Sequence, residues 1–261
     1  MEGPTCQNLS VEVDDGIAVV TIDRPKVMNA LNNETYRELI DCFQWIDKAP
    51  HIRVAIITGA GEKAFAAGAD ISALSHATGI ESLTSYAKEA MLKIENCSKP
   101  VIAAINGVAF GGGCEVALAC DIRIVSESAL IGLPETSLGL LPGAGGTQRL
   151  ARLVGMSLAK SVILAGKDLN ADEALSCGLA MRKAASGELM NVAKKTARAM
   201  MRKAPLALAI AKQAINRSMS ADLDTGLYLE SLAFSVLMGT EDKAEGTRAF
   251  AEKRAPVFQG R

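Results

Sequence analysis

The stretch Ala-Phe-Gly-Gly-Gly-Cys-Glu at residues 109–115 decides the fold, because three consecutive glycines are expected to open a helix there. The apolar run 101–105 predicts a short strand, and the apolar residues after Glu115 predict a buried helix. The first backbone N–H groups of a helix lack partners within it, and the helix dipole adds positive charge at that end. Glycine also lets a ligand approach the backbone closely. The stretch therefore predicts a site where main-chain N–H groups hold an oxygen atom, although a tight turn alone would also explain the glycines.

A second loop of small residues, Gly68-Ala69-Asp70, leads toward another helix start. N–H groups from the two loops can converge on one carbonyl oxygen and stabilise negative charge that develops on it. Either loop alone is better explained as a tight turn. No GxxxxGK[ST] motif is present, and the glycine triplet fits GxGxxG poorly, so nucleotide phosphate binding is not indicated.

Two glutamates stand beside glycine-rich turns. Glu115 follows the triplet, and Glu135 precedes the LPGAGGT run at residues 141–147. Apolar neighbours desolvate a carboxylate and raise its pKa toward values useful for acid–base chemistry. One carboxylate can then handle a water molecule while the other handles a carbon-bound proton. A lone glutamate at a helix start is more often a dipole partner, so this prediction rests on the whole set.

The chain around these motifs alternates short apolar runs with helical segments, which indicates an α/β core of βαβ units. Asp14-Asp15-Gly16 separates two β-rich runs as in a hairpin, and Asn32 or Asn33 can cap the first helix. After about Gly146 every segment reads as helix, which predicts an all-helical C-terminal layer. Strands are expected at 9–13, 17–22, 54–58, 101–105 and 122–125. Helices are expected at about 33–47, 82–97, from 111, 147–153, 156–164, 171–177, 187–203, 206–217, 222–237 and 241–252.

Composition and charge describe a protein with a sizeable core and no basic excess. Hydrophobic residues make up 49% of 261 residues, and the net charge of −1 argues against a general nucleic-acid binder. No CxxC occurs and His51 and His76 lie in unrelated contexts, so no metal site is expected. The six cysteines are expected to be reduced thiols. No signal peptide or membrane span is visible, so we expect a cytoplasmic protein that does not bind membranes.

Ordered motifs along nearly the whole chain resemble the enoyl-CoA hydratase/isomerase (crotonase) superfamily, and in particular its short-chain enoyl-CoA hydratase branch. The resemblance implies a crotonase-like spiral of ββα units over residues 1–195. It also implies a helical trimerisation region over residues 196–261, which forms homotrimers that often pair into homohexamers. The motifs are DRP at 23–25, MNALN at 28–32, FAAGADI at 65–71, AFGGGCE at 109–115, PE at 134–135, GLLPGAGGTQRL at 139–150 and FAEKR at 250–254.

The same resemblance implies reversible syn hydration of trans-2-enoyl-CoA thioesters such as crotonyl-CoA, in fatty acid β-oxidation. In the family, the residue matching Glu115 orients and deprotonates the attacking water, and the residue matching Glu135 delivers a proton to Cα. The N–H groups matching Ala69 and Gly112 form the oxyanion hole for the thioester. No metal or redox cofactor is expected, because CoA is part of the substrate.

The resemblance further implies a CoA-binding set. Lys26 is placed to approach a CoA phosphate, and the stretch 67–72 resembles the loop that meets the adenine and pantetheine. Phe234 and Lys253 match positions that reach the adenosine end from a neighbouring subunit, with core packing and a solvated charge as the respective alternatives. The full set is Lys26, Ala67, Ala69, Asp70, Ile71, Ser72, Gly112, Phe234 and Lys253.

The substrate is less well defined than the chemistry. Many hydratases have glutamine before Pro-Glu, whereas Leu133 stands here, and the acyl-pocket segments 72–85 and 156–164 do not set chain length. Within enzymes, the alternatives are a Δ3,Δ2-enoyl-CoA isomerase, which generally works with one carboxylate, and a branched-substrate hydratase related to methylglutaconyl-CoA hydratase. Glu115 and Glu135 together favour hydration. An RNA-binding protein is the non-enzyme alternative, but the basic cluster at 194–203 is typical of a solvated helix face.

Overall fold

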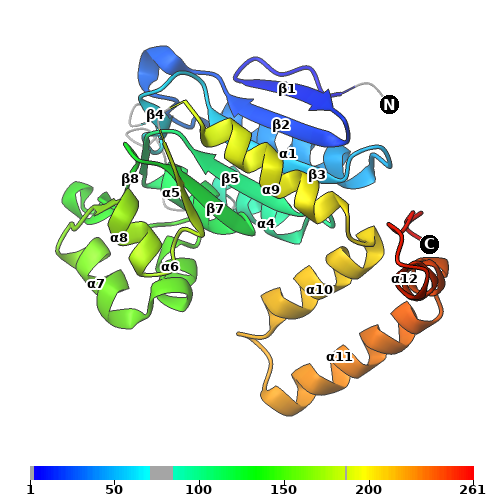
Figure 1. Ribbon diagram of the computed structural model, residues 1–261. Coiled ribbons are helices and arrows are strands. Elements are labelled where there is room, and N and C mark those ends of the chain that lie inside the picture. Colours follow the sequence, from blue (N-terminus) through cyan, green and yellow to red (C-terminus); the bar gives the residue numbers. More distant parts are fainter. Residues whose placement is uncertain (1–2, 71–84, 186) are drawn as a thin grey trace.

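The computed structural model describes residues 3–70, 85–185 and 187–261, which form two β-sheets, covering helices and a helical C-terminal arm (Figure 1). The strands are β1 (Leu9–Asp14), β2 (Ile17–Ile22), β3 (Val54–Gly59), β4 (Ala64–Ala66), β5 (Val101–Ile105), β6 (Val108–Phe110), β7 (Ile122–Ser126), β8 (Leu130–Gly132), β9 (Leu169–Asn170) and β10 (Arg182–Ala184). The helices are α1 (Asn33–Lys48), α4 (Tyr86–Asn96), α5 (Gly112–Ala119), α6 (Gly146–Val154), α7 (Met156–Leu164), α8 (Ala171–Ser176), α9 (Leu189–Met201), α10 (Pro205–Arg217), α11 (Leu223–Met238) and α12 (Glu241–Ala251), with short 3₁₀ turns η1 (Pro25–Val27) and η2 (Glu135–Leu138).

The two sheets are built by strands that alternate between them. The larger sheet has the order β1-β2-β3-β5-β7-β10, with β1 antiparallel to β2 and the later neighbours parallel. The smaller sheet has the order β4-β6-β8-β9, in which β4, β6 and β8 are parallel. From β3 to β8 each strand in one sheet is followed by a strand in the other. The chain therefore winds as a spiral of ββα units, which confirms the predicted α/β fold.

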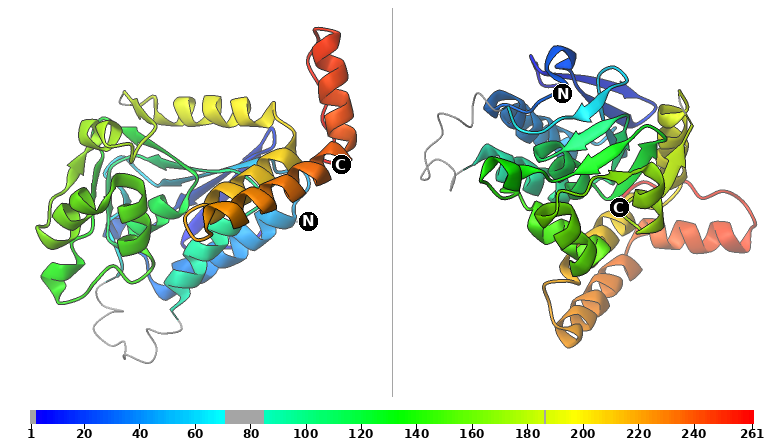
Figure 2. Two further views of the ribbon diagram at one scale, coloured as in Figure 1. Left: turned by 90° about the horizontal axis from the view of Figure 1, so that it is seen from below. Right: turned by 90° about the vertical axis from the view of Figure 1, so that its left-hand side faces the viewer.

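The core lies on both faces of the larger sheet. β3 and β5 are buried at every residue, as expected for parallel strands covered on both sides. Side chains alternate between faces along a strand, so Ile56 and Ile102 pack with α9, whereas Ile57 and Ile105 pack in the cluster that holds α1, α4 and α5. Figure 2 shows α9 lying across one side of the sheet with α1 and α4 on the other. Asn32, one of the two residues predicted as the cap, caps α1 by accepting a hydrogen bond from the Thr35 N–H.

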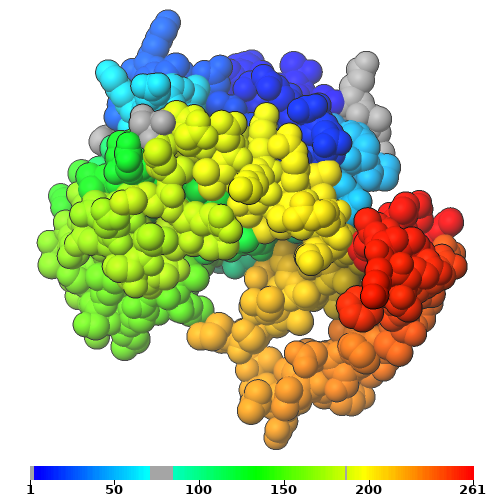
Figure 3. Space-filling model, in the orientation of Figure 1, coloured from blue at the N-terminus to red at the C-terminus, as the bar shows by residue number. Residues whose placement is uncertain are grey.

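The last helices form an arm that extends away from the sheets. α10 runs back along the body, while α11 and α12 project from it (Figures 1 and 3). α11 has no buried residue along its whole length, although it carries several large apolar side chains. Such a helix face is usually covered by another surface.

The structure corrects one prediction about the C-terminal half. The expected all-helical layer after Gly146 is wrong at β9 and at β10, which pairs in parallel with β7. These strands have two or three residues and too little apolar alternation to show in the sequence. The expected boundary between residues 195 and 196 falls within α9, which packs against the sheet on both sides of that point through Ala193 and Ala197.

Candidate active site

Glu115 is held in a buried cage of backbone N–H groups. It lies in the first turn of α5, and its side chain is only 4% exposed. Its Oε1 accepts hydrogen bonds from the Ala144 N–H (2.7 Å) and the Gly146 N–H (2.8 Å). Gly146 is the first residue of α6, so the carboxylate also lies at the positive end of that helix dipole. The predicted glycine-rich run 141–147 therefore serves to position Glu115.

The pKa of Glu115 is raised from 4.5 to about 7, and burial is the main cause. The two N–H bonds and the charge of Arg149 oppose this rise, while the charge of Glu135 adds to it. A carboxylate with a pKa near neutrality can both accept and release protons under physiological conditions. The structure thus confirms the desolvation that the apolar neighbours of Glu115 predict.

Glu135 approaches the same helix terminus from the other side. It opens η2, three residues after Gly132, whose carbonyl accepts a hydrogen bond from the Gly111 N–H. A Cβ on Gly111 would lie 3.2 Å from Glu135 Oε1 and 3.6 Å from the Gly68 Cα. Burial raises the pKa of Glu135, and among the residues that the structure describes its enclosed Oε2 has no hydrogen-bond partner. The two carboxylates and both small-residue loops therefore meet at the N-terminus of α5.

The backbone nitrogens of Ala69 and Gly112 lie close together beside this helix terminus. Leu31 bridges to Ala69 by donating to the Gly68 carbonyl (2.8 Å) and accepting from the Asp70 N–H (2.8 Å). In a parallel bridge this leaves the N–H of Ala69 itself directed away from Leu31. Gly112 is the first residue of α5, where N–H groups lack partners within the helix. A Cβ on Gly112 would lie 3.6 Å from the Ala69 nitrogen, so the two predicted donors are close neighbours.

Two glycines of the triplet are required by close contacts. A Cβ on Gly113 would lie 2.1 Å from the Ala66 carbonyl oxygen, which no atom can tolerate. A Cβ on Gly112 would lie 2.5 Å from the Tyr36 hydroxyl oxygen. Gly111 has a φ of +50°, in the region that favours glycine. The same three glycines therefore allow both the tight turn and the close contacts that form the site.

Arg149 also contributes to the site, although its position in the sequence alone does not indicate this. Its guanidinium donates to the Ala144 carbonyl (2.9 Å) and binds both carboxylate oxygens of Glu95 (3.2 and 2.7 Å). This fixes the loop whose N–H groups hold Glu115. The sequence carries no signal for the pairing, because Arg149 and Glu95 are 54 residues apart.

The segments predicted to bind CoA lie side by side at the edge of this site. The Ala67 N–H donates to the Met28 carbonyl (3.0 Å), and Arg24 binds Asp70 (3.3 Å). Lys26 is exposed in η1 within the same segment. Ile71 and Ser72, also predicted to contact CoA, lie outside the described residues. CoA binding at this edge stays a prediction.

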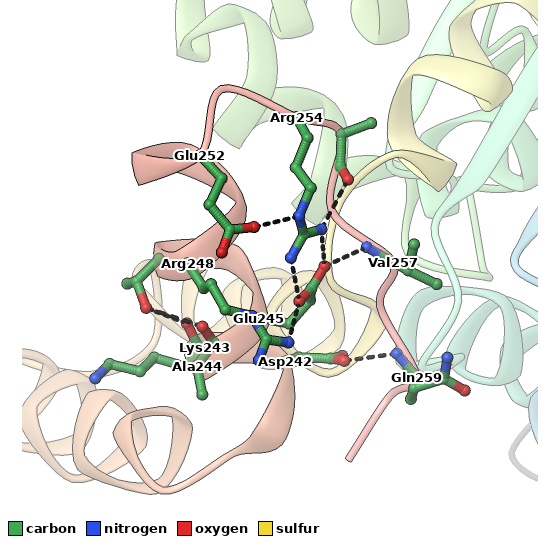
Figure 4. Close-up of polar contacts among 11 residues, drawn as sticks. Asp242, Lys243, Ala244, Glu245, Arg248, Glu252, Arg254, Val257 and Gln259 are labelled. Atoms are coloured by element: carbon green, nitrogen blue, oxygen red, sulfur yellow. Dashed lines mark hydrogen bonds and ion pairs between the residues drawn. The ribbon is translucent and has the colours of Figure 1, made fainter.

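Phe234 and Lys253 lie on the arm. Phe234 is 64% exposed on α11, so the alternative of core packing within this chain is wrong. Lys253 is exposed just after α12, with a φ of +53°. Its neighbours Glu252 and Arg254 belong to a polar network in which Arg254 also binds Glu245, and Figure 4 shows how this network holds the C-terminal tail against α12. Contact of Phe234 and Lys253 with a ligand of a neighbouring subunit stays a prediction.

The sequence model of the enoyl-CoA hydratase/isomerase family matches residues 12–261. The chain belongs to this family. A short-chain-enoyl-CoA hydratase of Clostridium acetobutylicum is 47% identical over 249 residues, which cover 95% of each chain. A crotonyl-CoA hydratase of Syntrophomonas wolfei is 41% identical and covers 97% of this chain and 98% of its own. The crystal structure of an enoyl-CoA hydratase from Bacillus anthracis has a TM-score of 0.94 at 40% identity, covering 98% of this chain and 100% of that one.

These comparisons confirm the predicted superfamily and its spiral fold. They also confirm that the protein is an enzyme of the enoyl-CoA hydratase type. Across the described parts of the chain, no helix is long and apolar enough to cross a bilayer, and no group of three or more histidine, cysteine or acidic side chains is arranged to hold a metal ion.

Proposed function

We propose that this enzyme catalyses the reversible syn hydration of short-chain trans-2-enoyl-CoA thioesters such as crotonyl-CoA. One observation supports this most strongly: two desolvated carboxylates, Glu115 and Glu135, lie near the same helix terminus, where the backbone nitrogens of Ala69 and Gly112 are close together and have no hydrogen-bond acceptor among the described residues. Hydration needs one group to take a proton from water and one to give a proton to carbon. It also needs donors for the charge that builds on the thioester oxygen.

In the proposed reaction, Glu115 takes a proton from water as the water oxygen bonds to C3 of the substrate. The π electrons of the double bond move onto the thioester oxygen, where the N–H groups of Ala69 and Gly112 stabilise the enolate. Glu135 then gives its proton to C2 as the enolate collapses back to the thioester. Dehydration runs the same steps in reverse. The free Oε2 of Glu135 agrees with a group that exchanges its proton with substrate rather than with the protein.

The preference for short chains rests on the relatives, because the names of two similar enzymes specify short-chain and crotonyl substrates. Leu133 is buried and packs near Gly146, behind the loop that holds Glu115. The preference can be tested by steady-state rates for straight-chain enoyl-CoA substrates with acyl chains from C4 to C16. A branched enoyl-CoA is measured beside them. A higher kcat/KM for the branched substrate would favour the methylglutaconyl-type alternative, and activity on 3-enoyl-CoA alone would favour isomerisation.

The direct test is the loss of the conjugated thioester absorbance of crotonyl-CoA as 3-hydroxybutyryl-CoA forms. Glu115→Gln and Glu135→Gln should each lower kcat by about 10²- to 10⁴-fold while CoA-ester binding is largely kept. Glu62→Gln, at an exposed position, is the matched control and should match the parent. Turnover within a few-fold of the parent in either active-site variant would contradict the assigned roles.

We further propose that the enzyme assembles as a homotrimer or a homohexamer through its C-terminal arm. The chain exposes 13826 Å², whereas a compact monomer of 27.3 kDa exposes about 11,000 Å². The excess agrees with α11, where Leu227, Leu232 and Phe234 are each about half exposed or more. Light scattering on the intact enzyme should give three or six chains, and a monomer at micromolar concentration would refute the assembly. A cytoplasmic location and a role in fatty acid β-oxidation belong to the same proposal.

A further inference from the structure

Tyr36 lies at the start of α1, next to the loop that carries the Ala69 N–H. Its side chain is buried, with 5% exposed, in the cluster that includes Leu31. Leu31 is bridged to Ala69, and the α1 cap at Asn32 follows directly. The start of α1 and the predicted oxyanion loop are therefore fixed to one another by backbone hydrogen bonds.

The Tyr36 hydroxyl occupies the space that a side chain on Gly112 would fill. A Cβ at Gly112 would lie 2.5 Å from this oxygen and 3.6 Å from the Ala69 nitrogen. The position of this Cβ is therefore within a few ångströms of the phenol oxygen and of both proposed oxyanion donors. Gly112 and Glu115 are three residues apart on α5, so they share a helix face. The hydroxyl lies on the side of the helix that bears the catalytic carboxylate.

The hydroxyl is also unpaired within the described part of the chain. Among the described residues no hydrogen bond to it is found, and the fully enclosed unpaired side-chain atoms there are Trp45 Nε1 and Glu135 Oε2. Buried hydroxyl groups are normally hydrogen-bonded, so a buried phenol whose oxygen has no partner among the described residues needs an explanation. A hydrogen-bond partner that arrives with the substrate provides one.

We propose that the Tyr36 hydroxyl is a third hydrogen-bond donor to the thioester oxygen, beside the N–H groups of Ala69 and Gly112. This inference rests on the proposed oxyanion hole and adds a side chain to it. Burial and the charges of Glu115 and Glu135 raise the pKa of Tyr36 above its usual value of 10. The phenol therefore keeps its proton throughout the working pH range and remains a donor. Glu115, with a pKa of about 7, is too weak a base to take this proton.

The test is Tyr36→Phe, which removes one oxygen and leaves the ring that packs in the core. Because that oxygen has no hydrogen-bond partner within residues 3–70, 85–185 and 187–261, the variant is expected to fold with an unchanged melting temperature. With crotonyl-CoA we expect kcat to fall by about 10²- to 10³-fold, as for loss of one oxyanion donor, with KM changed less than about threefold. Tyr86→Phe removes a hydroxyl from a more exposed position on α4 and should leave both constants unchanged.

A spectroscopic measurement separates this role from a structural one. Butyryl-CoA labelled at the thioester carbonyl is not a substrate, and each hydrogen bond to its oxygen lowers the carbonyl stretching frequency. On the parent enzyme the carbonyl stretching frequency should lie below that of the free thioester. On Tyr36→Phe it should lie between the value on the parent enzyme and the value of the free thioester. A lowered frequency that is the same in both proteins, with kcat within twofold, would overturn the role of Tyr36 alone. If the carbonyl stretching frequency on the parent enzyme equals that of the free thioester, the proposed oxyanion hole is refuted, and the proposed role of Tyr36 is refuted with it.

Discussion

Replacing Glu115 by glutamine is expected to stabilise the folded protein while it removes the proposed activity. Both donors, the N–H groups of Ala144 and Gly146, bond to the same oxygen of Glu115. The side-chain carbonyl oxygen of glutamine can accept both bonds. The substitution therefore keeps the loop in place and removes only the ability to ionise.

The magnitude follows from the pKa of Glu115, which burial raises from 4.5 to about 7. A group with a raised folded pKa contributes stability that is fully present below its unfolded pKa and is lost as the pH rises through the folded pKa. Since one pKa unit corresponds to about 1.4 kcal/mol, ionised Glu115 lowers the free energy of unfolding by about 3 kcal/mol at pH values above the folded pKa. Glutamine resembles the protonated form at every pH and avoids this loss.

The assay is urea unfolding followed by circular dichroism, at one protein concentration because association changes apparent stability. Relative to the parent, Glu115→Gln should be more stable by about 3 kcal/mol at about pH 8.5 and by about 1 kcal/mol at about pH 5. Glu62→Gln, which is exposed, should differ from the parent by less than about 0.5 kcal/mol at both pH values. An advantage of Glu115→Gln that does not grow with pH would refute the claim that burial governs this carboxylate.

Three other predictions test the site and the arm. The kcat/KM for hydration should rise with pH through about 7 as Glu115 ionises, and a flat profile would exclude it as the base in the free enzyme. Gly113→Ala should lower the melting temperature sharply or prevent folding, because its Cβ would lie 2.1 Å from the Ala66 carbonyl oxygen, and a parent-like melting curve would contradict that contact. Asp242→Ala should release the C-terminal tail to limited proteolysis, because Asp242 accepts the Gln259 N–H (2.6 Å), and equal protection in variant and parent would show that the tail is held elsewhere.

The sequence predicts the parts of this protein that depend on local rules. A cap at Asn32 or Asn33, a strand at 101–105 and a carboxylate after the glycine triplet follow from backbone chemistry within a few residues, and the structure has the Asn32 cap, β5 and Glu115. The strands β4, β6, β8, β9 and β10 were not predicted, because runs of two or three residues carry no measurable period. Contacts between residues that are far apart in the sequence could not be predicted either. The contact of Arg149 with Glu95 and the approach of Tyr36 to Gly112 exist only once the spiral has closed.

The pKa of Glu115 results from opposing effects that the fold sets separately. Burial alone would keep the carboxyl group protonated and useless as a base. The N–H groups at the start of α6, together with the charge of Arg149, lower the pKa again and leave it at about 7. Among the described residues Glu135 has no such cage and its Oε2 is unpaired, so this oxygen is available to a substrate. The proposed division of labour, with Glu115 acting on water and Glu135 acting on carbon, thus follows from which carboxylate the backbone holds and which it leaves free.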